Sequence, residues 1–288
     1  MRAAHWLPFV TPLALRYRFI LPDLRGFGGS HQTNLSQPCL LGNYADDVQD
    51  LLDELNLHRV HLGGISMGAY TGLQYLRSYG SERIKGYLHI DQAPMARNVQ
   101  GWRWGLFGDQ HEQRMDEFRE LIDLMESHGR NTPWQAVAPE TRSRLWRALA
   151  QFMGDAFHNL PLSLSLRWLL RNERIARRLL PPDNWPVYLD VMRGYLEGDY
   201  DMRESLATID VPMTVMVGTE SLMYPAPGQI WIKSQVQHAN IVCFEKCGHA
   251  VMLEKPRKFI WELSRFLSES TALSAASPEI MPRHKRAA

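Results

Sequence analysis

The sequence predicts an α/β fold in which helices cover both faces of a mostly parallel sheet. Short apolar segments alternate with amphipathic helical segments, and turn-forming glycine, proline and aspartate residues separate them. Such alternation is typical of parallel sheets, because each crossover helix returns the chain to the same end of the sheet. Residues 98–207 depart from it: they contain several amphipathic helices and no convincing strand, which predicts a helical lid inserted into the core.

The individual elements follow from local patterns. Apolar runs predict strands at residues 18–22, 59–63, 84–90, 213–218 and 241–244. Helical spacing and end signals predict helices at residues 6–17, 44–55, 67–79 and 256–267. We expect Asn43 to cap the second helix and Gly80 to end the third. The tryptophan and methionine residues of the lid are expected to form its packed core.

These elements predict four parts of the chain. Residues 1–97 form the first part of the α/β core, residues 98–207 the lid, and residues 208–270 the second part of the core. Residues 271–288, rich in alanine, serine and proline, are predicted to be a disordered tail.

Composition favours a small-molecule substrate over other partners. The chain has 288 residues, of which 45% are hydrophobic, so it can bury a large core. Its 32 basic and 31 acidic side chains nearly cancel, so we expect neither nucleic acid nor a membrane as a partner. No transmembrane run or signal peptide is expected. The three cysteines, Cys39, Cys243 and Cys247, fit reduced thiols in a cytoplasmic protein better than disulfides or a zinc site.

Two segments carry candidate chemistry. Gly64-Ile65-Ser66-Met67-Gly68 lies between a predicted strand and a predicted helix, where a sharp turn lifts a serine hydroxyl out of the sheet. Serine is a weak nucleophile until a base takes its proton. His249, in Cys247-Gly248-His249, follows the last predicted strand, and the preceding glycine lets its loop bend toward the serine.

These segments resemble the α/β-hydrolase superfamily and occur in its order. Asp23-x-Arg25-Gly26-x-Gly28-x-Ser30 comes first, then residues 64–68, then Gly248-His249 with Glu254-x-Pro256. Asp91-Gln92-Ala93-Pro94 with Gly101-Trp102 is similar to the branch of esterases and non-haem haloperoxidases. The resemblance covers residues 5–95 and 205–268. It implies a carboxylesterase-like serine hydrolase without cofactor or metal, an acyl-enzyme on Ser66, an oxyanion hole using the Met67 backbone N–H, and water activated by His249.

The chain departs from the family at the acid that orients the histidine. The family usually places an aspartate three residues after the glycine that ends the penultimate strand, and Ser221 occupies that position here. Two carboxylates are alternatives. We favour Asp91, at the end of the neighbouring strand, over the adjacent Glu220, because the triad is defined by geometry and not by chain position.

A second departure concerns the start of the chain. In the family a strand and a His-Gly loop precede the first helix, and the loop supplies the second oxyanion donor. This sequence begins at that helix. The strand would lie between the predicted strands at 18–22 and 59–63, so its loss leaves backbone groups unpaired. We therefore expect either that the natural polypeptide begins further upstream or that this chain is a damaged relative.

The resulting hypothesis is a hydrolase that cleaves an ester, or a related acyl bond, of a small apolar substrate. Thioester, lactone and carbon–carbon hydrolases use the same machinery and remain open. A catalytically inactive binding protein with the same fold is one alternative, favoured by Ser221 and the missing strand. A cofactor-free perhydrolase or haloperoxidase is another.

Overall fold

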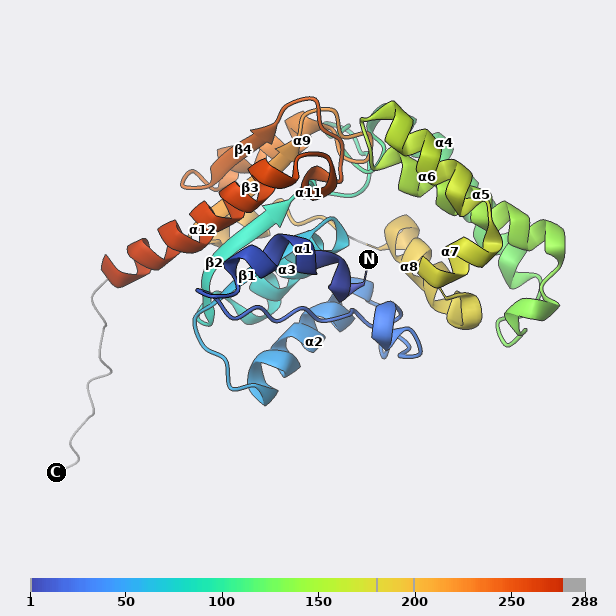
Figure 1. Ribbon diagram of the computed structural model, residues 1–288, viewed down its shortest axis with the longest axis horizontal. Helices are drawn as coiled ribbons and strands as arrows, with labels where there is room; N and C mark the ends of the chain where they lie inside the picture. The colour runs from blue at the N-terminus through green and yellow to red at the C-terminus, as the bar shows by residue number, and fades with distance from the viewer. Residues whose placement is uncertain (1, 180, 199, 277–288) are drawn as a thin grey trace.

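The structure, a computed structural model, describes residues 2–179, 181–198 and 200–276. Its centre is a four-stranded sheet, labelled in Figure 1. The strands are β1 (Val60–Ile65), β2 (Ile84–Ile90), β3 (Met213–Gly218) and β4 (Asn240–Phe244). They lie side by side in chain order, and every neighbouring pair is parallel. The fold is the predicted α/β fold.

Helices cover both faces of this sheet. One face carries α2 (Leu40–Glu54), α3 (Met67–Tyr79), α9 (Ala226–Ile230) and α10 (Ile232–Gln235). The other face carries α1 (Leu7–Val10), α11 (Val251–Glu254) and α12 (Pro256–Ala276). Neighbouring side chains along β2 point to opposite faces, so Tyr87 packs in the core with α2 and α3 while Leu88 packs with α1 and α12.

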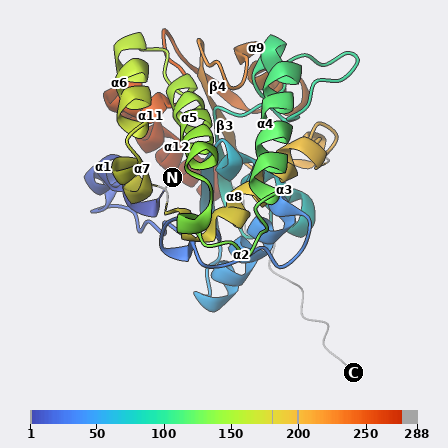
Figure 2. The same ribbon diagram turned by 90° about the vertical axis from the view of Figure 1, so that its right-hand side faces the viewer.

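A group of helices lies between β2 and β3 in sequence. Its helices are α4 (His111–Glu126), α5 (Pro139–Asp155), α6 (Leu160–Leu170), α7 (Glu173–Leu179) and α8 (Trp185–Glu197). Figure 1 shows them to the right of the sheet, and Figure 2 shows α4, α5 and α6 in front of it. We call residues 98–207 the lid. Trp134 and Trp146 are buried in its core as expected, but Trp168 is 74% exposed.

The N-terminal segment differs from the prediction. Residues 18–22 form no strand and pair with none of the strands in the described part of the chain. An extended segment becomes a strand only when a neighbouring chain supplies ladder hydrogen bonds. Without one, β1 is an edge strand. The predicted helix at 6–17 is shorter and broken: α1 is flanked by 3-10 turns at Ala3–Trp6 and Thr11–Leu13, with Pro8 and Pro12 near the starts of successive pieces.

Two further predictions need correction. Asn43 does not cap α2 but lies inside it, buried, where its Oδ1 accepts hydrogen bonds from the backbone of Ser36 and Gln37. Cys39 is the N-cap, and its sulfur accepts from the Gly42 amide at 3.3 Å. The disordered tail was predicted to begin at residue 271, yet α12 continues to Ala276. Residues 277–288 lie outside the described residues.

Candidate active site

Ser66 lies in a strained turn between β1 and α3. Its backbone φ of 55° and ψ of −123° lie in a region that residues with a side chain rarely adopt. The backbone amide of Ser66 donates to the carbonyl of Ile90 at 3.0 Å, which keeps this turn beside the end of β2. The strain is localised at a half-buried serine next to a helix start, as in a nucleophile elbow.

The two glycines around Ser66 play different parts. A Cβ on Gly64 would lie 2.3 Å from the carbonyl carbon of Gly68, so the close approach of β1 and α3 requires glycine there. A Cβ on Gly68 would meet no other atom within 4 Å. The strand-to-helix approach therefore depends on the absence of a side chain at Gly64, and Gly68 contributes backbone only. Gly72, one turn later, is required for space, because a Cβ there would lie 2.4 Å from the Tyr87 ring.

Asp91 and His249 meet at the carboxyl end of the sheet. Asp91 directly follows β2 and is fully buried, and its Oδ1 lies 2.7 Å from His249 Nδ1. The same carboxylate accepts hydrogen bonds from the Gly218 amide and from the Ser221 hydroxyl, both at 2.7 Å. Together these hydrogen bonds engage both oxygens of the carboxylate. Asp91 is therefore held in one orientation, facing the imidazole.

Glu220, the alternative acid, has a different environment. It is exposed, and its backbone amide donates to the Cys247 carbonyl at 2.9 Å. Within the described residues, no hydrogen bond or ion pair joins its carboxylate to His249. The structure thus brings Asp91, and not Glu220, to the histidine.

His249 and Ser66 both lie beyond the carboxyl ends of strands, without a direct hydrogen bond between them. Nδ1 of the imidazole contacts Asp91, so Nε2 is the nitrogen that can act on Ser66. Within the described residues, no hydrogen bond links Ser66 Oγ to the imidazole. Catalytic hydrogen bonds are often long in the absence of substrate, so the missing bond does not argue against a pair. Met67, the expected oxyanion donor, is the first residue of α3, where backbone N–H groups have no partner within the helix.

Ser221 has a function that the sequence did not reveal. Its hydroxyl donates to Asp91 and accepts from the Tyr224 amide at 3.3 Å. The Tyr224 ring lies 6.2 Å from the His249 ring, centroid to centroid. The one available signal was the position of Ser221, where the family carries its acid, since a residue there must lie beside the histidine.

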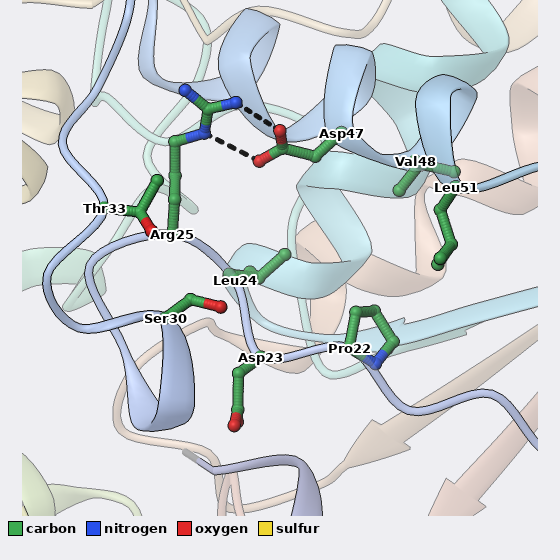
Figure 3. Close-up of a pocket in the computed structure, with 9 residues that line it drawn as sticks. All are labelled: Pro22, Asp23, Leu24, Arg25, Ser30, Thr33, Asp47, Val48 and Leu51. Atoms are coloured by element: carbon green, nitrogen blue, oxygen red, sulfur yellow. Dashed lines mark hydrogen bonds and ion pairs between the residues drawn. The ribbon is translucent and has the colours of Figure 1, made fainter. Parts of the chain in front are cut away.

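The loop at residues 23–30 has a structural role. Asp23 accepts from the amides of Ala3 at 2.6 Å and Gly29 at 2.8 Å, and Arg25 forms a two-point ion pair with Asp47 on α2. Figure 3 shows this pair beside a small pocket of about 160 Å³. The pocket lies between the loop and α2, and neither Ser66 nor His249 lines it.

Comparison with known proteins identifies the class. A family profile described as "Alpha/beta hydrolase family" matches residues 1–262, so the chain belongs to the α/β hydrolase family. Within the described residues, no helix has the length and apolar character that a membrane span needs, and no group of three His, Cys, Asp or Glu residues is arranged to hold a metal ion.

Named relatives are distant but cover most of the chain. A 3-oxoadipate enol-lactonase 1 from Acinetobacter baylyi is 24% identical over 265 residues, covering 91% of this chain and 83% of the relative. A pimeloyl-[acyl-carrier protein] methyl ester esterase from Aeromonas hydrophila is 26% identical, covering 93% and 91%. A bromoperoxidase structure from Bacillus anthracis superimposes with a TM-score of 0.71 at 20% identity, covering 93% of this chain and 88% of that chain. The chain is thus a hydrolase of this family with esterase-like homologues.

Proposed function

We propose that this protein is a serine hydrolase that cleaves an ester or related acyl bond through an acyl-enzyme on Ser66. The observation that carries the proposal is the 2.7 Å contact between Asp91 and His249, at the sheet edge where Ser66 occupies its strained turn. A histidine oriented by a carboxylate, at the end of the sheet that also carries a serine in a nucleophile turn, is the arrangement that acyl transfer requires.

In this mechanism His249 removes the proton from Ser66 Oγ, which attacks the acyl carbon. The backbone N–H of Met67 stabilises the developing oxyanion. The protonated imidazole then gives its proton to the leaving alcohol, and the same histidine activates the water that hydrolyses the acyl-enzyme. Asp91 accepts a hydrogen bond from Nδ1–H and stabilises the imidazolium whenever it forms.

We further propose a small, mainly apolar acyl group. The proposal is that some of the half-buried aromatic and methionine side chains that pack against the lid core face the acyl group: Trp104, Phe152, Met153, Tyr188, Met192 and Tyr195. The similar proteins include an enol-lactonase and methyl ester esterases, so both open-chain esters and lactones are suitable test substrates.

The test is labelling with a fluorophosphonate, which reacts only with an activated serine. We expect one labelled site in the wild-type protein, loss of that label in Ser66→Ala, and loss of p-nitrophenyl ester turnover in the same variant. A wild-type protein that binds apolar ligands without labelling would favour the inactive binding protein. Labelling together with peroxide-dependent halogenation would favour the perhydrolase alternative.

A further inference from the structure

Glu254, of the Glu254-x-Pro256 motif that follows the histidine, has no part in the mechanism above. It ends α11, five residues after His249, and is partly buried. Its two carboxylate oxygens bind different parts of the molecule. Oε2 accepts a hydrogen bond from the backbone amide of Gly248, directly before the histidine. Oε1 accepts from the backbone amide of Asn159 in the lid at 2.7 Å.

The part of the lid that Glu254 reaches is the corner between α5 and α6, residues 156–159. Asn159 is the N-cap of α6, and its side chain accepts from the Leu162 amide at 3.0 Å. This corner packs directly on the histidine loop, because the Ala250 amide donates to the Ala156 carbonyl at 2.9 Å. The approach is so close that a Cβ on Gly248 would lie 2.6 Å from the backbone nitrogen of His158.

The loop that carries His249 is therefore held from two sides. Asp91 contacts the imidazole from the sheet, and the lid corner contacts the backbone on either side of the ring. Glu254 also faces the buried Cys247: burial first, and then the Glu254 carboxylate, raise the pKa of that thiol to about 12. The amides of Gly248 and Asn159 and the thiol of Cys247 thus surround one carboxylate. A neutral or shorter side chain cannot reproduce this arrangement.

We propose that Glu254 is a positioning residue that couples the lid to the catalytic base, so that the imidazole is correctly aimed at Ser66 only while the α5–α6 corner is docked. This inference rests on the proposed function. It assigns to Glu254 an effect on the rate of the chemical step rather than on stability alone.

The test compares three variants of Glu254 with a matched control. Glu254→Gln keeps one oxygen and turns an NH2 group toward an N–H donor, and Glu254→Ala removes both acceptors. Glu254→Asp keeps the charge but shortens the reach. Glu245→Gln is the control, since Glu245 is exposed and lies only three residues before Gly248. We expect the Gln and Ala variants to lower kcat for p-nitrophenyl acetate by about 10- to 100-fold, with KM within about twofold.

The fluorophosphonate labelling rate of Ser66 should fall by the same factor as kcat, because both report the aim of the base. Both rates should also be reduced in Glu254→Asp, because its shorter side chain cannot reach both amides. Both rates of Glu245→Gln should match those of the wild type. Backbone amides of residues 156–159 and 247–250 should exchange with solvent faster in Glu254→Gln. Normal kcat and labelling in a variant that only melts earlier would overturn the proposal and leave a structural role.

The exchange measurement also separates this proposal from the proposed function. If wild-type Ser66 does not react with the fluorophosphonate, the proposed function fails. Linked loosening of the two backbone segments in Glu254→Gln would still establish the coupling between lid and loop. Unchanged exchange at both segments would refute it.

Discussion

Ser221 donates its hydroxyl hydrogen to Asp91 Oδ1 at 2.7 Å, the same oxygen that contacts His249 Nδ1. The residue at the family's usual acid position therefore binds the carboxylate that contacts the histidine. A serine at this position donates a hydrogen bond to Asp91 without adding a second buried carboxylate. This relationship explains how the site can lack the usual aspartate and still present an acid to His249.

The first prediction concerns which carboxylate is the acid. Asp91→Asn should lower kcat by about 10³- to 10⁴-fold, because the amide favours the wrong imidazole tautomer and cannot stabilise the imidazolium. Glu220→Gln should leave kcat within about twofold, since Glu220 is exposed and, in the described part of the chain, forms no hydrogen bond or ion pair with His249. Steady-state ester hydrolysis measures both. Equal rates for Asp91→Asn and the wild type would reverse the assignment.

A double variant that moves the carboxylate from position 91 to position 221 tests the same geometry. In Asp91→Asn/Ser221→Asp, the carboxylate returns at the usual family position, so we expect partial recovery of the activity lost in Asp91→Asn. Ser221→Asp alone should instead lower the free energy of unfolding, because two buried carboxylates would then lie side by side. Recovery no greater than in Asp91→Asn alone would show that residue 221 cannot reach the histidine.

The second prediction separates the two glycines of the serine turn. Gly64→Ala should prevent folding or destabilise the protein strongly, because the new Cβ would lie 2.3 Å from a backbone carbon of Gly68. Gly68→Ala should be neutral or stabilise the protein by up to about 1 kcal/mol, since the space is open and alanine favours helix. Urea denaturation of the two variants provides the comparison, and equal destabilisation by both would contradict it.

The third prediction is a loss of stability in mild acid. Burial lowers the pKa of both His61 and His89 to about 4. In the unfolded chain each histidine gains a proton below pH 6.5, while in the folded protein both remain neutral. The unfolded state therefore binds more protons between pH 6.5 and 4. The free energy of unfolding should fall as pH falls through this window, by at most about 1.4 kcal/mol per pH unit for each histidine.

His61 provides the variant for this measurement. Its ring centroid lies 5.4 Å from that of Phe266, and its buried Nε2 has no hydrogen-bond partner among the described residues. We therefore expect His61→Phe to be tolerated and to reduce the pH slope. His58→Gln, at an exposed position, should leave the slope unchanged. Denaturation at pH 7 and pH 5 is sufficient. An unchanged slope in His61→Phe would exclude this histidine as a source.

The fourth prediction concerns the open edge of β1. The amides of Val60 and Ser66 donate to carbonyls at the two ends of β2, Arg83 and Ile90. Amides alternate in direction along a strand, so those of His61, Gly63 and Ile65 point away from β2. Hydrogen exchange should be faster at these three amides than within β2, which is paired on both sides. Equal protection would mean that another chain segment covers this edge in solution.

The sequence by itself determined the elements whose signals are local. The strands at 84–90 and 213–218 and the helix at 67–79 were predicted with the bounds that the structure has. Their apolar runs and bounding residues act within a few positions of chain. Gly80, for example, ends α3 with a φ of 73°, a conformation that glycine adopts without strain. The strand–Ser66–helix order is likewise local, so the position of the candidate nucleophile could be predicted.

Only the tertiary structure decided the features that depend on a distant partner. Residues 18–22 have the composition of a strand but no neighbour to pair with, and Asn43 has the residue type of a cap but binds an earlier loop instead. Three contacts of the site join residues that are far apart in the chain: Asp91 with His249, Ser221 with Asp91, and Glu254 with Asn159 of the lid. The first of them decides between Asp91 and Glu220 as the acid. Side-chain direction at the ends of strands and the packing of the lid fix these contacts, and sequence spacing encodes neither.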